Sequence, residues 1–216
     1  MKDKNYEETG EEPWYKGPIK WVIGIFMILL IVLMAVPYYS IKLDPEPQEN
    51  TNLEDINKLI HANPSKTANG IEEAWELIDK NNPQIKFAAD SIISSSCDEN
   101  EICYAKALYY FLRDKIKYVS DPIGKEYIEA PETVLKTGAA DCESGSLLLL
   151  NMMESIGIES ELVLIPGHAF IRIKIDKAPG KYKHEGWIYL DWTCESCGFG
   201  EVPYGSLGKK MRFMDI

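Results

Sequence analysis

Hydrophobic residues are gathered near the start of this chain in one uncharged run from position 21 to 41, between Lys20 and Lys42. Twenty-one residues at about 1.5 Å each span roughly 30 Å, which is enough to cross a bilayer as a helix. Trp21 and the Tyr38-Tyr39 pair stand at its ends, where aromatic rings favour the membrane interface. The pattern predicts a transmembrane helix over residues 18–41. A cleaved signal peptide is the alternative, but its apolar run is usually shorter and its leader is not acidic.

The segments on either side of this run are polar. Residues 1–17 are predicted to be disordered, and residues 42–50 to form a stiff, charged, proline-containing linker. Cytoplasmic flanks are generally the more basic ones, which places the N-terminus in the cytoplasm and residues 51–216 outside it. The N-terminal flank carries Lys2, Lys4, Lys16 and Lys20, whereas the other flank carries Lys42 and Lys58.

Residues 51–216 are predicted to be one domain that begins with helices. Apolar residues recur at helical spacing near residues 53–60, 71–78, 83–95 and 101–118. Proline and glycine interrupt the pattern over residues 121–140, which we expect to be a long loop. The stretch from Cys142 to about Ile156 is apolar on every side and ends at Gly157, so it predicts a buried helix.

Three predicted strands follow this helix, over residues 159–165, 168–175 and 186–192. In the second, Ile171, Ile173 and Ile175 alternate with Arg172 and Lys174, as in a half-buried strand. The glycine-rich tail from Cys194 is expected to be irregular.

Size and charge limit the function classes. A chain of 216 residues and 24.5 kDa can hold one domain with a sizeable core and additional segments. Its net charge is −11, so the phosphate backbone of nucleic acids would repel it, and general nucleic-acid binding is excluded. Of the five cysteines, Cys142 lies alone between two close pairs. In an oxidising exterior four can pair, and Cys142 is the candidate for a free thiol.

Cys142 opens the buried helix, with Asp141 as its expected N-cap. The helix dipole and free backbone N–H groups should lower the pKa of the thiol, and the same groups could bind an oxyanion. Gly145 and Ser146 keep the first turn small, so that a strand can approach. The simpler interpretation is that Cys142 is a buried packing residue.

His168 and Asp191 complete a possible thiol-based acyl-transfer site. His168 follows the Pro166-Gly167 turn at the start of a strand, and Asp191 ends the apolar strand Trp187-Ile-Tyr-Leu. A histidine can accept the thiol proton, and a carboxylate can orient the imidazole. An ordinary turn histidine and a strand-end cap are the alternatives.

Together these residues resemble the transglutaminase-like superfamily, including archaeal-type membrane-anchored members. The resemblance covers about residues 100–195. It implies a papain-like α+β fold, in which the cysteine-bearing helix packs on an antiparallel sheet. It also implies that Cys142 is the nucleophile, His168 the base and Asp191 the orienting acid. The matching elements are Tyr118, Gly-x-x-x-Cys142, Ile156-Gly-Ile158, His168 and Trp187-x-x-x-Asp191-x-Thr193.

The expected function is a thiol enzyme that acts on a protein or peptide amide through a thioester, by transfer or by hydrolysis. The alternative is a non-catalytic binding or assembly module with the same fold. Glu143 stands where animal transglutaminases have an aromatic residue, and no EF-hand loop points to calcium. We expect no cofactor, and the sequence does not predict an oligomeric state. Tyr118 and Tyr127 are the candidates for an oxyanion-binding side chain.

The remaining cysteines allow three interpretations. Cys194-x-x-Cys197 could be a redox motif, although it does not open a helix after a strand. Together with Cys97 and Cys103 it could bind zinc, although the gap between Cys97 and Cys103 is wider than usual for that metal. Structural disulfides are the third interpretation, and their connectivity cannot be derived from the sequence.

Overall fold

A computed structural model of the chain describes residues 17–48, 51–63, 66–122, 124–125, 127–206 and 208–214. Nearly all of the predicted disordered segment 1–17 lies outside these residues, as do residues 49 and 50 of the predicted linker. The chain forms two compact units, which meet between Lys42 and Leu43.

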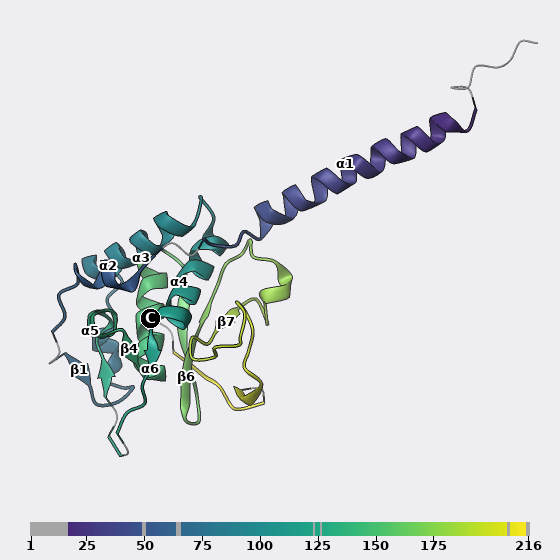
Figure 1. The fold of residues 1–216 in the computed structure, drawn as a ribbon. Helices are drawn as coiled ribbons and strands as arrows, with labels where there is room; N and C mark the ends of the chain where they lie inside the picture. The colour runs from purple at the N-terminus through teal and green to yellow at the C-terminus, as the bar shows by residue number, and fades with distance from the viewer. Residues whose placement is uncertain are drawn as a thin grey trace, which may run out of the picture. The chain divides into compact units, whose positions relative to one another are not determined.

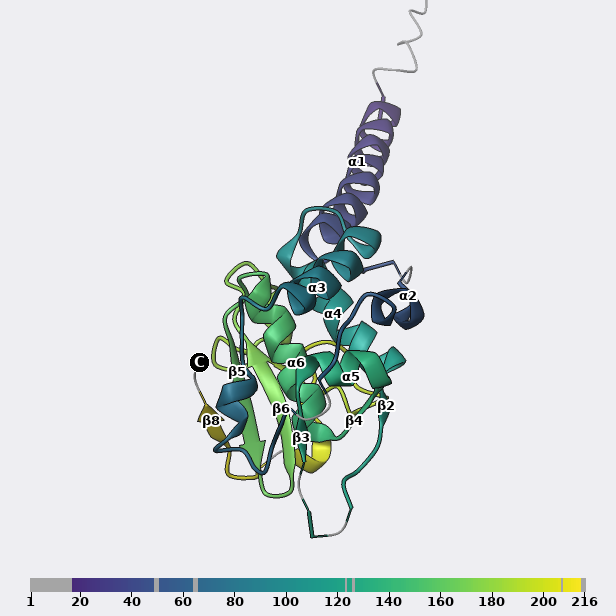
Figure 2. The ribbon, with the colours of Figure 1, turned by 90° about the vertical axis from the view of Figure 1, so that its left-hand side faces the viewer.

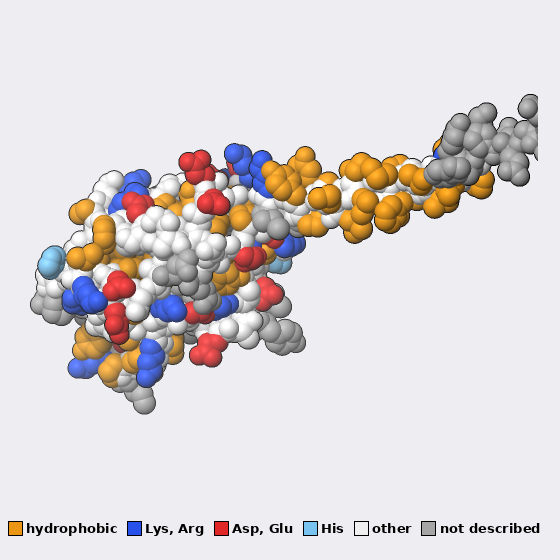
Figure 3. Space-filling model, turned by 45° about the horizontal axis from the view of Figure 1, so that its top comes forward, with side chains coloured by type: hydrophobic (Ala, Val, Ile, Leu, Met, Phe, Trp, Pro, Cys, Tyr) orange, Lys and Arg blue, Asp and Glu red, His pale blue; other side chains and the backbone are white. Residues whose placement is uncertain are grey.

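The first unit contains one long helix, α1 (Ile19–Leu43). Its segment Ile19–Tyr39 has a mean hydropathy of 2.8, and none of it is buried. Figure 3 shows hydrophobic side chains along this helix. Its length and composition are sufficient to cross a membrane, as the sequence predicted for residues 18–41.

The second unit mixes helices and strands, which confirms the predicted α+β class (Figure 1). Its helices are α2 (Leu53–Asn57), α3 (Pro83–Ser96), α4 (Glu101–Lys115), α5 (Pro131–Thr137) and α6 (Cys142–Ser155). Shorter 3₁₀ helices are η2 (Ala74–Leu77), η3 (Gly180–Tyr182) and η4 (Tyr204–Ser206).

The main sheet is antiparallel and has the strand order β7-β6-β5-β8. Its strands are β5 (Ser160–Ile165), β6 (His168–Ile173), β7 (Ile188–Leu190) and β8 (Arg212–Met214). Two small ladders accompany it, with β1 and β3 antiparallel and β2 and β4 parallel. Their strands are β1 (Thr67–Ala68), β2 (Lys117–Tyr118), β3 (Ile128–Glu129) and β4 (Ala139–Ala140).

Helix α6 lies at the centre of the unit. It contacts β5 and β6 on one side and α3, α4 and α5 on the other, as Figures 1 and 2 show. The four consecutive leucines 147–150 are completely buried, because each side of the helix meets another element. Each buried leucine contributes about 1.5–3 kcal/mol relative to an exposed one. The outer face of the sheet carries a second, smaller cluster around Val163 and Phe170, with Val202 and Met211 packed against it.

The predicted helix at residues 71–78 is wrong, because only the single 3₁₀ turn η2 forms there. It buries just Ala74 and Leu77, too little apolar surface to support a longer helix. Helix α4 ends at Lys115, three residues before its predicted end, because Lys117 and Tyr118 pair with Ala139 and Ala140 as β2.

The expectation of a structureless loop over residues 121–140 is also wrong. Pro131 is at the first position of α5, where a missing N–H costs nothing, and Gly138 ends that helix at φ 70°. These two residues act as helix boundaries here. The tail is likewise more ordered than expected, since Arg212–Met214 pairs with β5 as β8.

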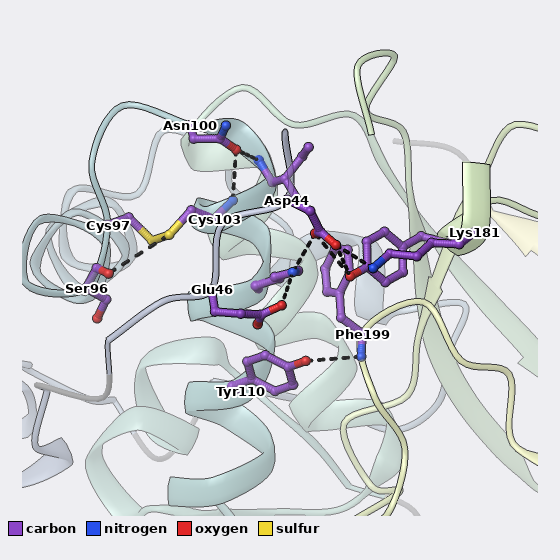
Figure 4. Close-up of polar contacts among 12 residues, drawn as sticks. Asp44, Glu46, Ser96, Cys97, Asn100, Cys103, Tyr110, Lys181 and Phe199 are labelled. Atoms are coloured by element: carbon purple, nitrogen blue, oxygen red, sulfur yellow. Dashed lines mark hydrogen bonds and ion pairs between the residues drawn. A yellow bond between two sulfur atoms is a disulfide. The ribbon is translucent and has the colours of Figure 1, made fainter. Parts of the chain in front are cut away.

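The first two residues of the predicted linker, Lys42 and Leu43, end helix α1, and residues 44–48 contact the domain (Figure 4). Lys106 on α4 is completely buried and forms ion pairs with Asp44, at 2.7 Å, and with Glu46. Tyr182 donates a hydrogen bond of 2.9 Å to Asp44, and Lys181 pairs with the same carboxylate. The segment therefore places two carboxylates at the buried ammonium of Lys106, of which that of Asp44 is mostly buried and that of Glu46 is exposed.

Candidate active site

His168 and Asp191 form the most direct contact of the site. His168 is the first residue of β6, after a turn in which Gly167 has φ 75°. Asp191 directly follows β7, which pairs with β6. The distance from His168 Nε2 to Asp191 Oδ2 is 2.6 Å. The histidine is 21% exposed and the aspartate 2%, so the imidazole meets solvent from one side only.

The carboxylate of Asp191 is fixed on its other oxygen as well. Oδ1 accepts hydrogen bonds from the backbone N–H and the hydroxyl of Thr193, at 3.1 and 2.7 Å. The Tyr109 hydroxyl donates to the Asp191 backbone carbonyl at 3.3 Å. A buried carboxylate with these partners is oriented, and it fixes the histidine ring so that Nδ1 remains for another group.

Cys142 is the first residue of α6, and Asp141 is the N-cap, as predicted. The Asp141 side chain accepts the backbone N–H of Ser144 at 2.8 Å. Burial raises the pKa of Asp141 to about 6 even though the Ser144 hydrogen bonds lower it, and the charges of Glu143 and Asp121 raise it further. Cys142 has a free thiol and is 8% exposed.

The first turn of α6 forms hydrogen bonds with Ala169 and Trp192, the residues that follow His168 and Asp191. The Cys142 sulfur lies against the backbone N–H of Ala169, and the Ser146 hydroxyl donates to the Ala169 carbonyl at 3.2 Å. Trp192 Nε1 donates to the Cys142 carbonyl at 3.5 Å. The structure thus pairs His168 with Asp191 and places Cys142 against the residues that follow them, and it shows no hydrogen bond from Cys142 to His168 among the described residues.

Gly145 permits this close approach. A Cβ at this position would lie less than 3 Å from three atoms of the Trp192 indole. The sequence indicated a small first turn at Gly145 and Ser146, but it did not identify Trp192 as the partner. The only clue was the position of Trp192 directly after the candidate acid.

Tyr118 lies in the site, as the sequence suggested for an oxyanion-binding residue. Pairing of β2 with β4 sets Tyr118 opposite Ala140, two residues before Cys142. Its hydroxyl is within hydrogen-bond reach of the Cys142 thiol, and burial, followed by the charge of Cys142, raises its pKa. Tyr127 forms hydrogen bonds through its backbone, with its N–H donating to Asp121 and its carbonyl accepting from Ser144.

Glu143 is the hydrogen-bond partner of the Cys142 thiol in this structure. The Cys142 thiol donates a hydrogen bond of 2.7 Å to Glu143 Oε2. Burial, followed by this hydrogen bond and the charge of Glu143, raises the pKa of Cys142 to about 12. The sequence predicted a lowered pKa at the helix N-terminus, and the structure instead gives a raised one, because the thiol is buried beside a carboxylate. The sequence showed an unusual residue at 143 but not where its side chain points.

A cleft of about 630 Å³ opens at the site. Glu143 and His168 both line it, so a bound molecule would meet the carboxylate and the imidazole together. The other lining residues are Asn69, Gly70, Ile71, Glu72, Ile128, Leu164, Ile165, Pro166, Gly167, Lys210 and Arg212.

The four other cysteines form two disulfides, Cys97–Cys103 and Cys194–Cys197. This pairing agrees with the structural-disulfide interpretation and leaves no thiol of these four cysteines free to bind zinc. The described residues contain no group of three or more side chains placed to hold a metal ion. Cys194–Cys197 follows β7 in a turn and does not open a helix.

Comparison with known proteins shows a family resemblance over part of the chain. A profile of the transglutaminase-like superfamily matches residues 88–192. No curated protein matches the chain. Among solved structures, one from Parabacteroides distasonis titled a "putative protease" aligns with 14% identity and a TM-score of 0.39. The alignment covers 64% of this chain and 25% of that one, so this chain spans about a quarter of that protein's length.

Proposed function

Residues 88–192 form a domain of the transglutaminase-like superfamily, and from this premise we propose that the protein is a membrane-anchored thiol enzyme that acts on an amide. Cys142 is the nucleophile, His168 the general base and acid, and Asp191 the residue that orients the histidine. The observation that carries the proposal is the 2.6 Å contact between His168 and the buried Asp191, beside the helix that Cys142 opens.

The reaction begins with transfer of the thiol proton from Cys142 to His168 Nδ1, while Nε2–H remains bonded to Asp191. The thiolate attacks the amide carbonyl carbon, the C–S bond forms, and the C–N bond breaks as His168 returns the proton to the leaving amine. Water or an amine then attacks the thioester, and the thiol is restored. Water gives hydrolysis and an amine gives acyl transfer.

The oxyanion formed in each step needs hydrogen-bond donors. We assign this role to the Tyr118 hydroxyl, which lies beside the thiol, and to backbone N–H groups at the start of α6. Donors fixed in advance at a buried site stabilise developing charge far better than donors in water.

The helix α1 serves as the membrane anchor in this proposal, with the N-terminus in the cytoplasm and the domain outside it. The basic N-terminal flank supports this orientation. The two disulfides support it independently, because disulfides persist in oxidising compartments.

The chemistry can be tested without knowing the substrate, with p-nitrophenyl acetate as acyl donor. For the full chain in detergent micelles, we expect acetylation of Cys142 with release of nitrophenolate. His168→Ala should slow this step about tenfold, because the base is lost while the activated ester needs little help in leaving. Nitrophenolate absorbance gives the rate, and mass spectrometry of the intact protein and its peptides locates the acetyl group.

His184→Ala is the matched control, because His184 bridges to Trp187 in a hairpin and does not line the cleft. It should leave the rate unchanged. Equal rates in the wild type and in His168→Ala would contradict the enzyme proposal. They would support the binding-module alternative, in which Cys142 is a packing residue that Glu143 keeps protonated.

A further inference from the structure

Glu143 occupies a position that the proposed reaction does not explain. Its carboxylate accepts a hydrogen bond from the Cys142 thiol, and the proposed reaction must transfer the proton of that thiol to His168. It also lines the cleft, so a molecule that binds there meets the carboxylate before the thiol can react. Cys142 itself is 8% exposed.

The two carboxylates nearest the thiol in the sequence oppose its ionisation. Asp141 precedes Cys142, and the charges of Glu143 and Asp141 both raise the pKa of Cys142. Glu72 adds a further carboxylate to the wall of the cleft, and Tyr118 contributes a neutral hydroxyl. The two basic residues of the cleft, Lys210 and Arg212, come from β8 and the segment before it. Neither of them forms an ion pair with Glu143 among the described contacts, so the carboxylate of Glu143 is left to pair with a cation of a bound molecule.

We propose that Glu143 keeps Cys142 protonated in the free protein and selects substrates with a positive charge beside the reacting amide. The inference rests on the proposed function of Cys142. A cationic group of the substrate pairs with the Glu143 carboxylate. The hydrogen bond between this carboxylate and the thiol then breaks, and the thiol can transfer its proton to His168. Glu143 is thus a positioning and specificity residue, and it takes no part in bond formation.

Two effects of the cation act in the same direction. Pairing removes the acceptor that holds the thiol proton, and it offsets the negative charge that a thiolate would face at 2.7 Å. Charge compensation of this kind is stronger near a protein surface than in bulk water, because the effective dielectric constant is lower there. A neutral or anionic substrate must break the same hydrogen bond without this compensation.

Cys142 can itself report the effect, because it is the only free cysteine of the chain and all five cysteines lie in the described part. Methanethiosulfonates react with a thiolate to form a disulfide and release methanesulfinate. The probes are three methanethiosulfonates: a cationic trimethylammonium-ethyl, a neutral methyl and an anionic sulfonato-ethyl reagent. The rate of each reagent with Cys142 is divided by its rate with glutathione, which corrects for intrinsic reactivity. On the full chain in neutral detergent, we expect the cationic reagent to be favoured over the anionic one by about tenfold.

Glu143→Gln should reduce this preference to about twofold or less and speed the reaction with the neutral methyl reagent. Glu72→Gln is the matched control in the same cleft and should keep most of the preference. An unchanged preference in Glu143→Gln, or an equal loss in Glu72→Gln, would overturn the proposal, as would faster reaction with the anionic reagent.

The outcome separates this inference from the proposed function. If His168→Ala slows acetylation but Glu143→Gln leaves the charge preference unchanged, the thiol site stands and the role of Glu143 fails. If His168→Ala has no effect on acetylation, the proposed function itself fails.

Discussion

Replacement of Lys106 by methionine is expected to lower the free energy of unfolding of the domain by about 3 kcal/mol. Lys106 is completely buried on α4, and its ammonium pairs with Asp44, whose side chain is 14% exposed, and with Glu46, which is 65% exposed. Methionine fills a similar volume but leaves the Asp44 carboxylate without its main partner. Breaking a buried pair costs more than the pair contributes, because the remaining charge stays desolvated.

Thermal or urea unfolding of the full chain in detergent, followed by near-ultraviolet circular dichroism, measures this effect. Lys86→Met is the matched control, since Lys86 pairs with Asp90 on the surface of α3. Removing such an exposed pair costs about 0.5 kcal/mol or less. A loss in Lys106→Met no larger than in Lys86→Met would show that residues 44–48 add little to the stability of the domain.

The same cluster predicts a dependence of stability on pH. Burial raises the pKa of Asp44, but hydrogen bonds from Lys106, Lys181 and Tyr182 outweigh it and hold the pKa below its usual value. Because the folded pKa is the lower one, ionised Asp44 stabilises the fold above pH ~4, and this contribution is lost as the pH falls through the folded pKa. Asp44→Asn should therefore reduce the loss of stability on acidification.

Long periodic segments of the fold could be predicted from the sequence. Helix α6 and strands β5 and β6 follow clear apolar patterns, because each is long enough to show its period and is buried by its neighbours. Helix α5 has seven residues and strand β8 has three, too few for a period to emerge. Their formation depends on tertiary contacts, such as the pairing of β8 with β5.

The site was predictable as a set of residue types and less so as a geometry. The order of Cys142, His168 and Asp191 along the chain, with the elements that carry them, indicated which side chains should meet. The direction of the Glu143 side chain could not be read from the sequence, because an exposed first-turn glutamate normally faces water. The burial of Lys106 could not be predicted from the sequence either, because its partner Asp44 is 62 positions away.

Gly145→Ala is the second change with a large expected effect, because it alters packing directly beside the site. In an open helix the substitution would add about 0.5–1 kcal/mol of stability, since alanine favours the helix over glycine. Here a Cβ would lie less than 3 Å from the indole of Trp192, which is 2% exposed and has no room to withdraw. Overpacking of this kind costs about 1–3 kcal/mol, which exceeds the helix gain, so we expect a net loss of about 1–2 kcal/mol.

The effect on reactivity should be larger than the effect on stability. Trp192 follows Asp191, and its Nε1 donates to the carbonyl of Cys142. Moving the indole therefore displaces the acid and the nucleophile relative to each other. A shift of about 1 Å can cost about a hundredfold in rate. We expect a loss of this size in the acetylation of Cys142, measured by nitrophenolate release from p-nitrophenyl acetate.

Gly180→Ala is the matched control, because a Cβ at that glycine meets nothing within 4 Å. It should change neither stability nor rate. Trp192→Phe in the Gly145→Ala background removes the atoms that the new methyl group meets. The double variant should therefore be more stable than the sum of the two single changes predicts, by about 1 kcal/mol or more. If the losses of stability in the two single variants simply add in the double variant, Gly145 is not required for the close approach of α6 to Trp192.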